Sequence, residues 1–202
     1  NSTDSGHVRV YAWNGSVWVQ RGADINGEAA SDQSGFSVAL SSDGNTLAIG
    51  APFNDGNGSD SGHVRIFSWN GSVWTQLGAD INGEGSGDQS GYSVALSSDG
   101  NTLAIGAVNN DGNGTNSGHV RVYAWNGSTW VQRGSDLRGE SPDDRSGTSV
   151  ALSSNGNTLA IGARLNDGNG TNSGHVRIYG WDGSSWIQRG DDLNGETAND
   201  QS

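Results

Sequence analysis

The residues of this sequence that are most able to bind a ligand are carboxylates that return at a fixed spacing. Asp24, Glu28 and Asp32 form one group of three, and the same pattern comes back in each later copy. An Asp and a Glu four residues apart supply the oxygen atoms that calcium prefers. A carboxylate just before a Ser-Gly turn can instead accept hydrogen bonds from the backbone and cap the turn. The candidate cation ligands of this pattern are Asp24, Glu28, Asp32, Asp80, Glu84, Asp88, Asp136, Glu140 and Asp144, and the last copy holds Asp192, Glu196 and Asp200.

A second group of oxygen-bearing side chains lies in Gly-rich loops such as 52–62. Oxygen ligands at alternating positions of such a loop could hold calcium. Each loop has only one or two carboxylates, however, which favours Asx turns that shape a long connection. The candidates are Asp55, Asn57, Asp111, Asn113, Asp167 and Asn169.

Tryptophans occur in pairs around a short polar segment, as in WNGSVW at 13–18. Side chains of this size fill the groove between neighbouring elements or, when they are exposed, form platforms for sugar rings. Groove filling is the favoured interpretation, and a lectin-like platform is the alternative. The pairs are Trp13 and Trp18, Trp69 and Trp74, Trp125 and Trp130, and Trp181 and Trp186.

Several Asn residues stand in Asn-X-Ser/Thr sequences, which accept N-linked glycans in proteins that pass through a eukaryotic secretory route. The candidates are Asn14, Asn57, Asn70, Asn113, Asn126 and Asn169, and Asn1 begins a further such sequence. Position 182 holds Asp and breaks the pattern.

Four His residues also recur, and each is followed two positions later by Arg, as in His63 and Arg65. In a strand, two such side chains point to the same face. Because the four His belong to different repeats, we expect hydrogen bonds between repeats and an Arg stacked on an aromatic ring, not one shared metal site. No segment resembles a nucleophile with its base or a phosphate-binding loop, so an enzyme is not expected.

The composition limits the classes of partner. The 202 residues include 34 Gly and no Cys, and the formal net charge is −12. Without Cys there is no disulfide framework and no thiolate metal site. An acidic chain with few basic residues is unsuited to binding nucleic acid, and no apolar run is long enough to span a membrane. The expected partner is a protein, a glycan or further copies of the chain.

The spacing of the tryptophan pairs shows that the chain is built from repeats of 56 residues. Within one period, the segments 35–40, 45–51, 63–69 and 74–78 alternate large apolar residues with small or polar ones, which predicts β-strands. The Asn-Gly pair at 70–71 predicts a two-residue type I′ turn between the last two strands.

Four short strands in a period of this length predict an all-β fold in which each period is one blade of a β-propeller. The expected units are half a blade at 1–34 and whole blades at 35–90, 91–146 and 147–202. Half a blade would leave unpaired backbone groups. We therefore expect that the chain is part of a longer repeat array, or that another chain completes the half-blade.

Two motifs in this period carry a family resemblance. Gly35 with Ser37-Val38, and Gly50-Ala51-Pro52, resemble the FG-GAP repeat of integrin α-chain propellers and of many secreted microbial proteins. The resemblance implies a propeller, usually of seven blades, that is extracellular and used for binding or adhesion. It also implies calcium in an Asp-rich loop between the first two strands. Here that turn carries only Asp43, so this site is not carried over.

These patterns together predict an extracellular, non-enzymatic segment that supplies a binding, adhesion or structural surface. A lectin-like propeller that binds glycans through the Trp pairs is the alternative from another class, and a propeller enzyme is a remote one. Calcium is a candidate cofactor. The fold alone does not name the ligand.

Overall fold

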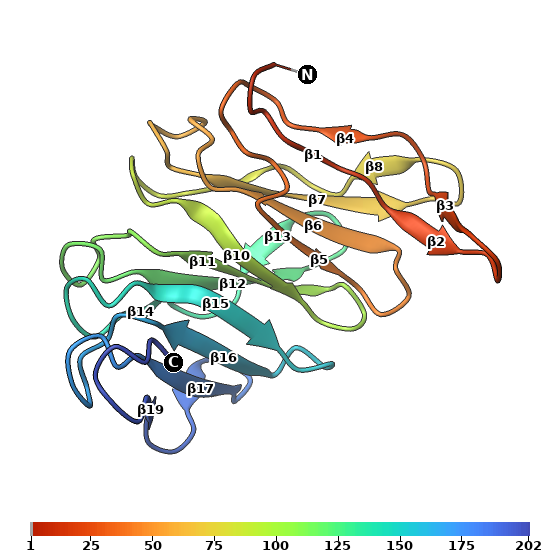
Figure 1. Cartoon of the computed structure of the whole chain (residues 1–202). Helices are drawn as coiled ribbons and strands as arrows, with labels where there is room; N and C mark the ends of the chain where they lie inside the picture. Colours follow the sequence, from red (N-terminus) through yellow and green to blue (C-terminus); the bar gives the residue numbers. More distant parts are fainter. Residues whose placement is uncertain (1) are drawn as a thin grey trace.

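The computed structural model describes residues 2–202, so the glycan acceptor sequence at Asn1 lies outside the described residues. The described chain has nineteen β-strands. No helix within it is long and apolar enough to cross a membrane. Its sheets follow one another from the N-terminus to the C-terminus and, within residues 2–202, do not close into a ring (Figure 1). The predicted all-β fold with propeller-type blades is confirmed.

One blade is an antiparallel sheet in the order β5-β6-β7-β8. Its strands are β5 (Ser37–Leu40), β6 (Thr46–Ala51), β7 (His63–Trp69) and β8 (Trp74–Gln76). A fifth short strand, β9 (Ile81–Asn82), pairs with the start of β7. Small and large side chains alternate along these strands. Successive residues of a strand point to opposite faces of the sheet, so the alternation gives each face side chains of one kind.

The next two blades repeat this sheet. The second is made of β10 (Ser90–Leu96), β11 (Thr102–Ala107), β12 (His119–Trp125), β13 (Trp130–Gln132) and β14 (Leu137–Arg138). The third is made of β15 (Ser146–Leu152), β16 (Thr158–Ala163), β17 (His175–Trp181), β18 (Trp186–Gln188) and β19 (Leu193–Asn194).

The N-terminal part has only the two outer strands of a blade. Here β1 (His7–Val8) pairs with β4 (Ile25–Asn26), and β2 (Tyr11–Trp13) pairs with β3 (Trp18–Gln20). Their residues stand at the repeat positions of β7 to β9.

The outer strand is longer than the sequence predicted. Phe67 pairs with Gln76, and Val64 pairs with Ile81, so four residues at 77–80 face only two residues of β7. Gly78, at φ +83°, lies in this bulge. The bulge divides the outer strand into β8 and β9 and returns Ile81 to the core, where it is buried.

The prediction of a type I′ turn at Asn70-Gly71 is wrong. Gly71 has a φ of +103°, but Asn70 is not among the residues with positive φ. The Asn70 side chain is used instead: its Oδ1 accepts hydrogen bonds from the backbone N–H groups of Ser72 and Val73, both at 3.0 Å. Asp182 accepts the equivalent two bonds in the last repeat, so Asp can take the place of Asn in this turn.

The hydrophobic core lies between the sheets, not within one of them. Leu47 and Ile49 point from β6 toward the N-terminal half-blade, where they pack with Val10 and Ile25. Ala48, on the opposite face of β6, packs with Leu103 and Ile105 of the second blade. An equivalent cluster joins the second and third blades. Both faces of a central strand are therefore buried, as in stacked propeller blades.

Hydrogen bonds to backbone carbonyl groups join the inner edges of successive blades. Ser37 Oγ donates to the carbonyl of Gly91 in the next blade at 2.7 Å, and Ser93 Oγ donates to Gly147 in the same way. In the turns between the first two strands, the N–H of Ser42 donates to the carbonyl of Ser98, and the N–H of Ser98 donates to that of Ser154, both at 2.9 Å. These bonds set each blade against its neighbour.

Candidate functional site

Each joint between consecutive blades brings one Glu, one His and one Asp together. In the first joint Glu28 comes from the link that leaves one repeat, His63 begins β7 of the next, and Asp80 precedes β9 of that same blade. One possible ligand atom from each residue lies within 4.8 Å of the others. The equivalent clusters are Glu84, His119 and Asp136, and Glu140, His175 and Asp192. The term joint cluster is used below for these three groups.

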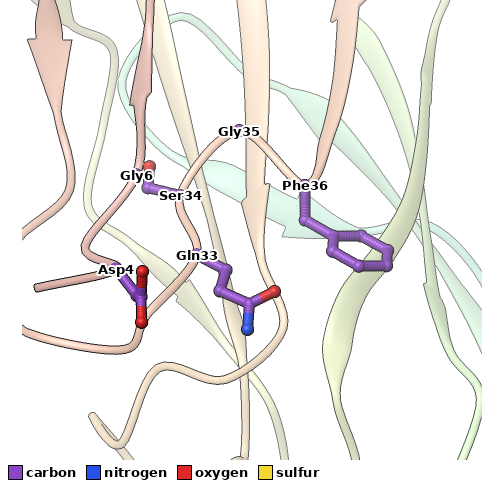
Figure 2. Close-up of a pocket in the computed structure, with 6 residues that line it drawn as sticks. All are labelled: Asp4, Gly6, Gln33, Ser34, Gly35 and Phe36. Carbon is purple, nitrogen blue, oxygen red and sulfur yellow. The ribbon is translucent and has the colours of Figure 1, made fainter.

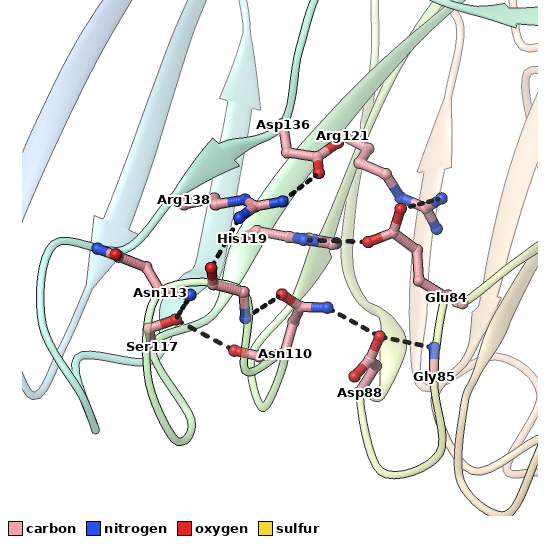
Figure 3. A network of polar contacts seen from close by, with 12 residues as sticks. Glu84, Gly85, Asp88, Asn110, Asn113, Ser117, His119, Arg121, Asp136 and Arg138 are labelled. Atoms are coloured by element: carbon pink, nitrogen blue, oxygen red, sulfur yellow. Dashed lines mark hydrogen bonds and ion pairs between the residues drawn. The ribbon is translucent and has the colours of Figure 1, made fainter.

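The middle joint cluster shows how the side chains are arranged (Figure 3). Glu84 places Oε2 at 3.8 Å from Nδ1 of His119 and Oε1 at 3.8 Å from Nη1 of Arg121. Arg121 also donates from Nη2 to the carbonyl of Asn82 in the preceding blade at 2.7 Å. The guanidinium therefore holds one carboxylate oxygen and leaves the other facing the imidazole.

Burial controls the protonation of the imidazoles. His119 is only 1% exposed, while the Glu84 side chain is 45% exposed. The pKa of His119 is lowered to about 4: burial is the largest cause, the charges of Arg121 and Arg138 act in the same direction, and Asp136 and Asp88 act in the opposite direction. Burial followed by the adjacent Arg also lowers the pKa of His63 and of His175. The imidazoles are therefore neutral at neutral pH and can offer a lone pair.

The role expected for the His and Arg pairs is confirmed in part. The Arg65 guanidinium lies 5.5 Å from the ring centre of Phe67, and Nη2 donates to Asn26 of the preceding repeat at 2.7 Å. The sequence interpretation missed the carboxylates that meet the His. Glu28 and His63 come from neighbouring repeats, and only the stacking of the blades brings them together.

The structure divides the predicted group of Asp24, Glu28 and Asp32 among different roles. Oδ2 of Asp32 accepts the backbone N–H of Ala29 at 3.0 Å and Nδ2 of Asn54 at 2.9 Å, which is the turn-capping role. Asp88 and Asp144 repeat this arrangement. Asp24 lies at 3.8 Å from Arg9, while its repeat equivalents Asp80 and Asp136 enter joint clusters.

The Asx residues of the long loops bond to the backbone. Oδ1 of Asp55 accepts the N–H of Asp60 at 2.9 Å. Nδ2 of Asn57 donates to the carbonyls of Gly83 and Glu84 at 2.8 and 3.1 Å, and so fixes the backbone that carries Glu84. Asp111 and Asn113, and Asp167 and Asn169, make the same contacts in their own loops.

The two sets of glycan acceptor sequences differ in whether Nδ2 of the Asn is used in a hydrogen bond. Asn57, Asn113 and Asn169 are exposed, but their Nδ2 atoms donate to the backbone. The exposed turn residues Asn14 and Asn70 use only Oδ1 in hydrogen bonds, and Asn126 also donates from Nδ2 to Thr129. A glycan is attached at Nδ2, so the turn residues Asn14 and Asn70 are the better placed acceptors. Glycosylation itself stays a prediction.

The second Trp of each later pair docks on the preceding repeat. Nε1 of Trp74 donates to the carbonyl of Arg21 at 2.8 Å, and the Arg21 guanidinium lies over both Trp69 and Trp74 at 4.9 and 5.6 Å. Trp130 and Trp186 donate to the preceding repeat in the same way. Trp13 and Trp18, in the N-terminal half-blade, are 54% and 66% exposed. This geometry fits groove filling, and sugar binding stays a prediction.

Two of the hollows on the described surface bear on the question of a site. One, of about 350 Å³, is lined by Asp4, Gly6, Gln33, Ser34, Gly35 and Phe36 (Figure 2), and Asp4 is the one ionisable residue in that lining. The other, of about 460 Å³, lies at the last joint cluster. Its lining includes Glu140 and Asp192 of that cluster, together with Asp144 and Asp167. The first hollow groups no catalytic set, while the second is strongly acidic.

The fold and the joints define a class of protein, namely repeat proteins made of stacked propeller-type blades. The FG-GAP repeat matches residues 26–67, 82–123 and 139–179, which is more than half of the chain. The chain belongs to the FG-GAP repeat family, as the sequence resemblance predicted. No curated protein matches the chain.

The solved structures that share this fold include two proteins from Bacteroides. Both proteins are provisionally assigned as 6-phosphogluconolactonases. The one from Bacteroides uniformis ATCC 8492 is 13% identical with a TM-score of 0.65, and the match covers 96% of this chain and 50% of that one. The one from Bacteroides fragilis NCTC 9343 is 14% identical with a TM-score of 0.54, covering 80% of this chain and 39% of that one. The chain thus spans half or less of these proteins, and at such identity the likeness shows the fold alone.

Proposed function

We propose that this chain is a segment of an extracellular, non-enzymatic FG-GAP protein whose repeated outer hairpins form a binding or adhesion surface. The FG-GAP match supports this proposal, because such repeats are typical of extracellular and surface proteins. The partner is a protein or a glycan.

One observation carries the proposal: apolar side chains recur outward on the outer edge of every blade. Val19, Val131 and Ile187 occupy one position of the outer strands β3, β13 and β18, and each is about half exposed. Val17 and Val73 are similarly exposed in the adjoining turns. A row of exposed apolar groups with polar surroundings is typical of an interaction surface.

The charged groups give no comparable support to an enzyme. The buried His residues recur as copies in the three joints, and the Arg beside each of them bonds to the preceding repeat. Catalysis by a propeller would rest on a group that departs from the repeat, as an acid or base placed beside a substrate. The enzymatic assignment of the two similar structures belongs to those proteins and is not carried over.

The test uses residues that the repeats themselves exchange. Val19, Val131 and Ile187 are replaced by Thr, the residue of the same position at Thr75, and Val17 and Val73 by Ser, as at Ser185. Binding to panels of extracellular-matrix proteins and of glycans is measured by surface plasmon resonance for the unmodified chain and for the variant that carries these five replacements. We expect a partner whose affinity falls at least tenfold in the variant. Turnover of 6-phosphogluconolactone, or a ligand that binds both proteins equally, contradicts the proposal.

A further inference from the structure

Two of the three joint clusters contain a buried imidazole with a ring nitrogen that has no hydrogen-bond partner in the protein. His119 and His175 are each 1% exposed. Nδ1 of both residues is buried without a hydrogen bond, and Nε2 of His175 is also unpaired. The carboxylates opposite stand at 3.6 to 3.8 Å, too far for a hydrogen bond of ordinary length. A buried polar atom without a partner is unfavourable, so these nitrogens need a ligand.

The charge around each imidazole favours a cation. In the first joint Glu28, Asp80 and the buried Asp32 act on His63, and Arg65 is the one opposing charge in direct contact with Glu28. A neutral imidazole leaves this group with an excess of two negative charges. One divalent cation would balance it.

We propose that each of the three joint clusters binds a divalent transition-metal ion such as Zn²⁺ through one imidazole nitrogen and two carboxylate oxygens. This proposal is independent of what the outer hairpins bind. A donor set with one nitrogen suits Zn²⁺ better than Ca²⁺, which prefers oxygen ligands only. The site therefore differs from the calcium sites considered from sequence.

The distances suit such an ion after a small adjustment. Donor atoms of a tetrahedral zinc site lie about 3.4 Å apart, given bonds of about 2.1 Å. The Glu and His atoms stand at 3.8 Å in all three joints. Glu84 is half exposed and free to move toward His119, while Arg121 keeps hold of its other oxygen. Three protein ligands leave further coordination positions for water.

The middle site differs from the other two by one charge. Arg138 occupies the repeat position of Asn82 and Asn194, and its Nη2 lies 3.4 Å from Oδ2 of Asp136. This extra positive charge opposes a cation and occupies one of its ligands. We therefore expect the middle site to be the weakest, and Arg138→Asn to raise its affinity by about three- to tenfold.

The experiment titrates ZnCl₂ into chelator-treated protein that carries no His tag, by isothermal titration calorimetry. We expect saturation with three sites, matching the three joint clusters. Glu28→Gln and Glu140→Gln should each remove one site. Glu196→Gln is the matched control, because it has the same place in the repeat while residues 2–202 hold no His of a following repeat beside it. The control should keep all three sites.

A second readout separates binding from misfolding. Zinc should raise the melting temperature of the unmodified chain, because a ligand of the folded state stabilises it. Without metal, the Glu→Gln variants should melt close to the unmodified chain, because the replaced side chains are half exposed. Absence of saturable zinc binding, three sites retained in both variants, or binding of calcium in place of zinc overturns the proposal.

Discussion

The α-carbon of Gly50 faces the carbonyl oxygen of Gly91 across the joint between the first two whole blades. A methyl group on Gly50 would lie 2.1 Å from that oxygen, and Gly106 meets Gly147 with the same value in the next joint. The glycine of the GAP motif in one blade is thus required by the glycine that is the second residue of the first strand of the next blade, Gly91 in β10 and Gly147 in β15. The family signature records the close approach of two blades.

Replacing Gly50 by Ala should therefore weaken the first joint. The added Cβ collides with backbone, which cannot rotate away as a side chain can, so we expect a loss of about 1–3 kcal/mol in the free energy of unfolding. Urea denaturation followed by tryptophan fluorescence measures this loss. Gly85→Ala is the control, because its Cβ would meet Asp88 at an ordinary 3.6 Å and Ala29 stands at that repeat position. Equal stability of the two variants would contradict the joint contact.

The indole N–H of Trp130 should matter more than that of Trp18. Trp130→Phe removes the 3.0 Å bond to the carbonyl of Leu77 and leaves that oxygen without its partner, and we expect a loss of about 1–3 kcal/mol. Trp18→Phe changes a side chain that is 66% exposed and should stay within about 0.5 kcal/mol. Thermal melts of both variants make the comparison. A similar loss in both would argue that the tryptophans act through something other than the joint.

The outer hairpin turn should depend on an acceptor atom and not on an amide. Asn70→Ala removes Oδ1, which accepts two backbone N–H groups, and should lower stability by about 0.5–1.5 kcal/mol. Asn70→Asp should be nearly neutral, because Asp182 accepts the equivalent bonds at 2.7 and 2.8 Å. Chemical denaturation of the two variants distinguishes the roles. If Asp proves as harmful as Ala, the acceptor explanation fails.

The metal-free protein should lose stability as the pH falls below about 6.5. The pKa of His119 is about 4 in the folded protein, against 6.5 for an unperturbed His, so between these values the unfolded chain binds more protons. Protonation then favours unfolding. His63 and His175 act in the same direction, because their pKa values are also lowered. Urea unfolding in the presence of a chelator at pH 7.5, 6.5 and 5.5 tests this prediction, and a constant free energy across the three would contradict it.

Much of the blade was predictable from sequence because its signals are local. Alternating side chains placed the strands at 45–51 and 63–69 within about a residue of β6 and β7. The end of the outer strand was harder to predict. Ile81 reads as part of a loop in the sequence, and only its burial against the neighbouring blade shows that it belongs to the sheet.

The joint clusters could not be predicted from spacing within one repeat. Glu28 and His63 are 35 positions apart and belong to different blades, so their contact depends on how the sheets stack. The regular recurrence of these Asp and Glu residues did indicate them as candidate cation ligands. Their partners, however, are set by the joint, while Asp32, from the same predicted group, caps a turn.

The backbone hydrogen bonds from Ser42 to Ser98 and from Ser98 to Ser154 also provide a way to detect the separation of neighbouring blades. Each amide donates across a joint and not within its own sheet, so it exchanges with solvent when two blades separate even if both sheets stay folded. Hydrogen exchange at Ser42 and Ser98 therefore measures the opening of individual joints. Comparison with amides inside β6 and β11 separates undocking of a blade from its unfolding.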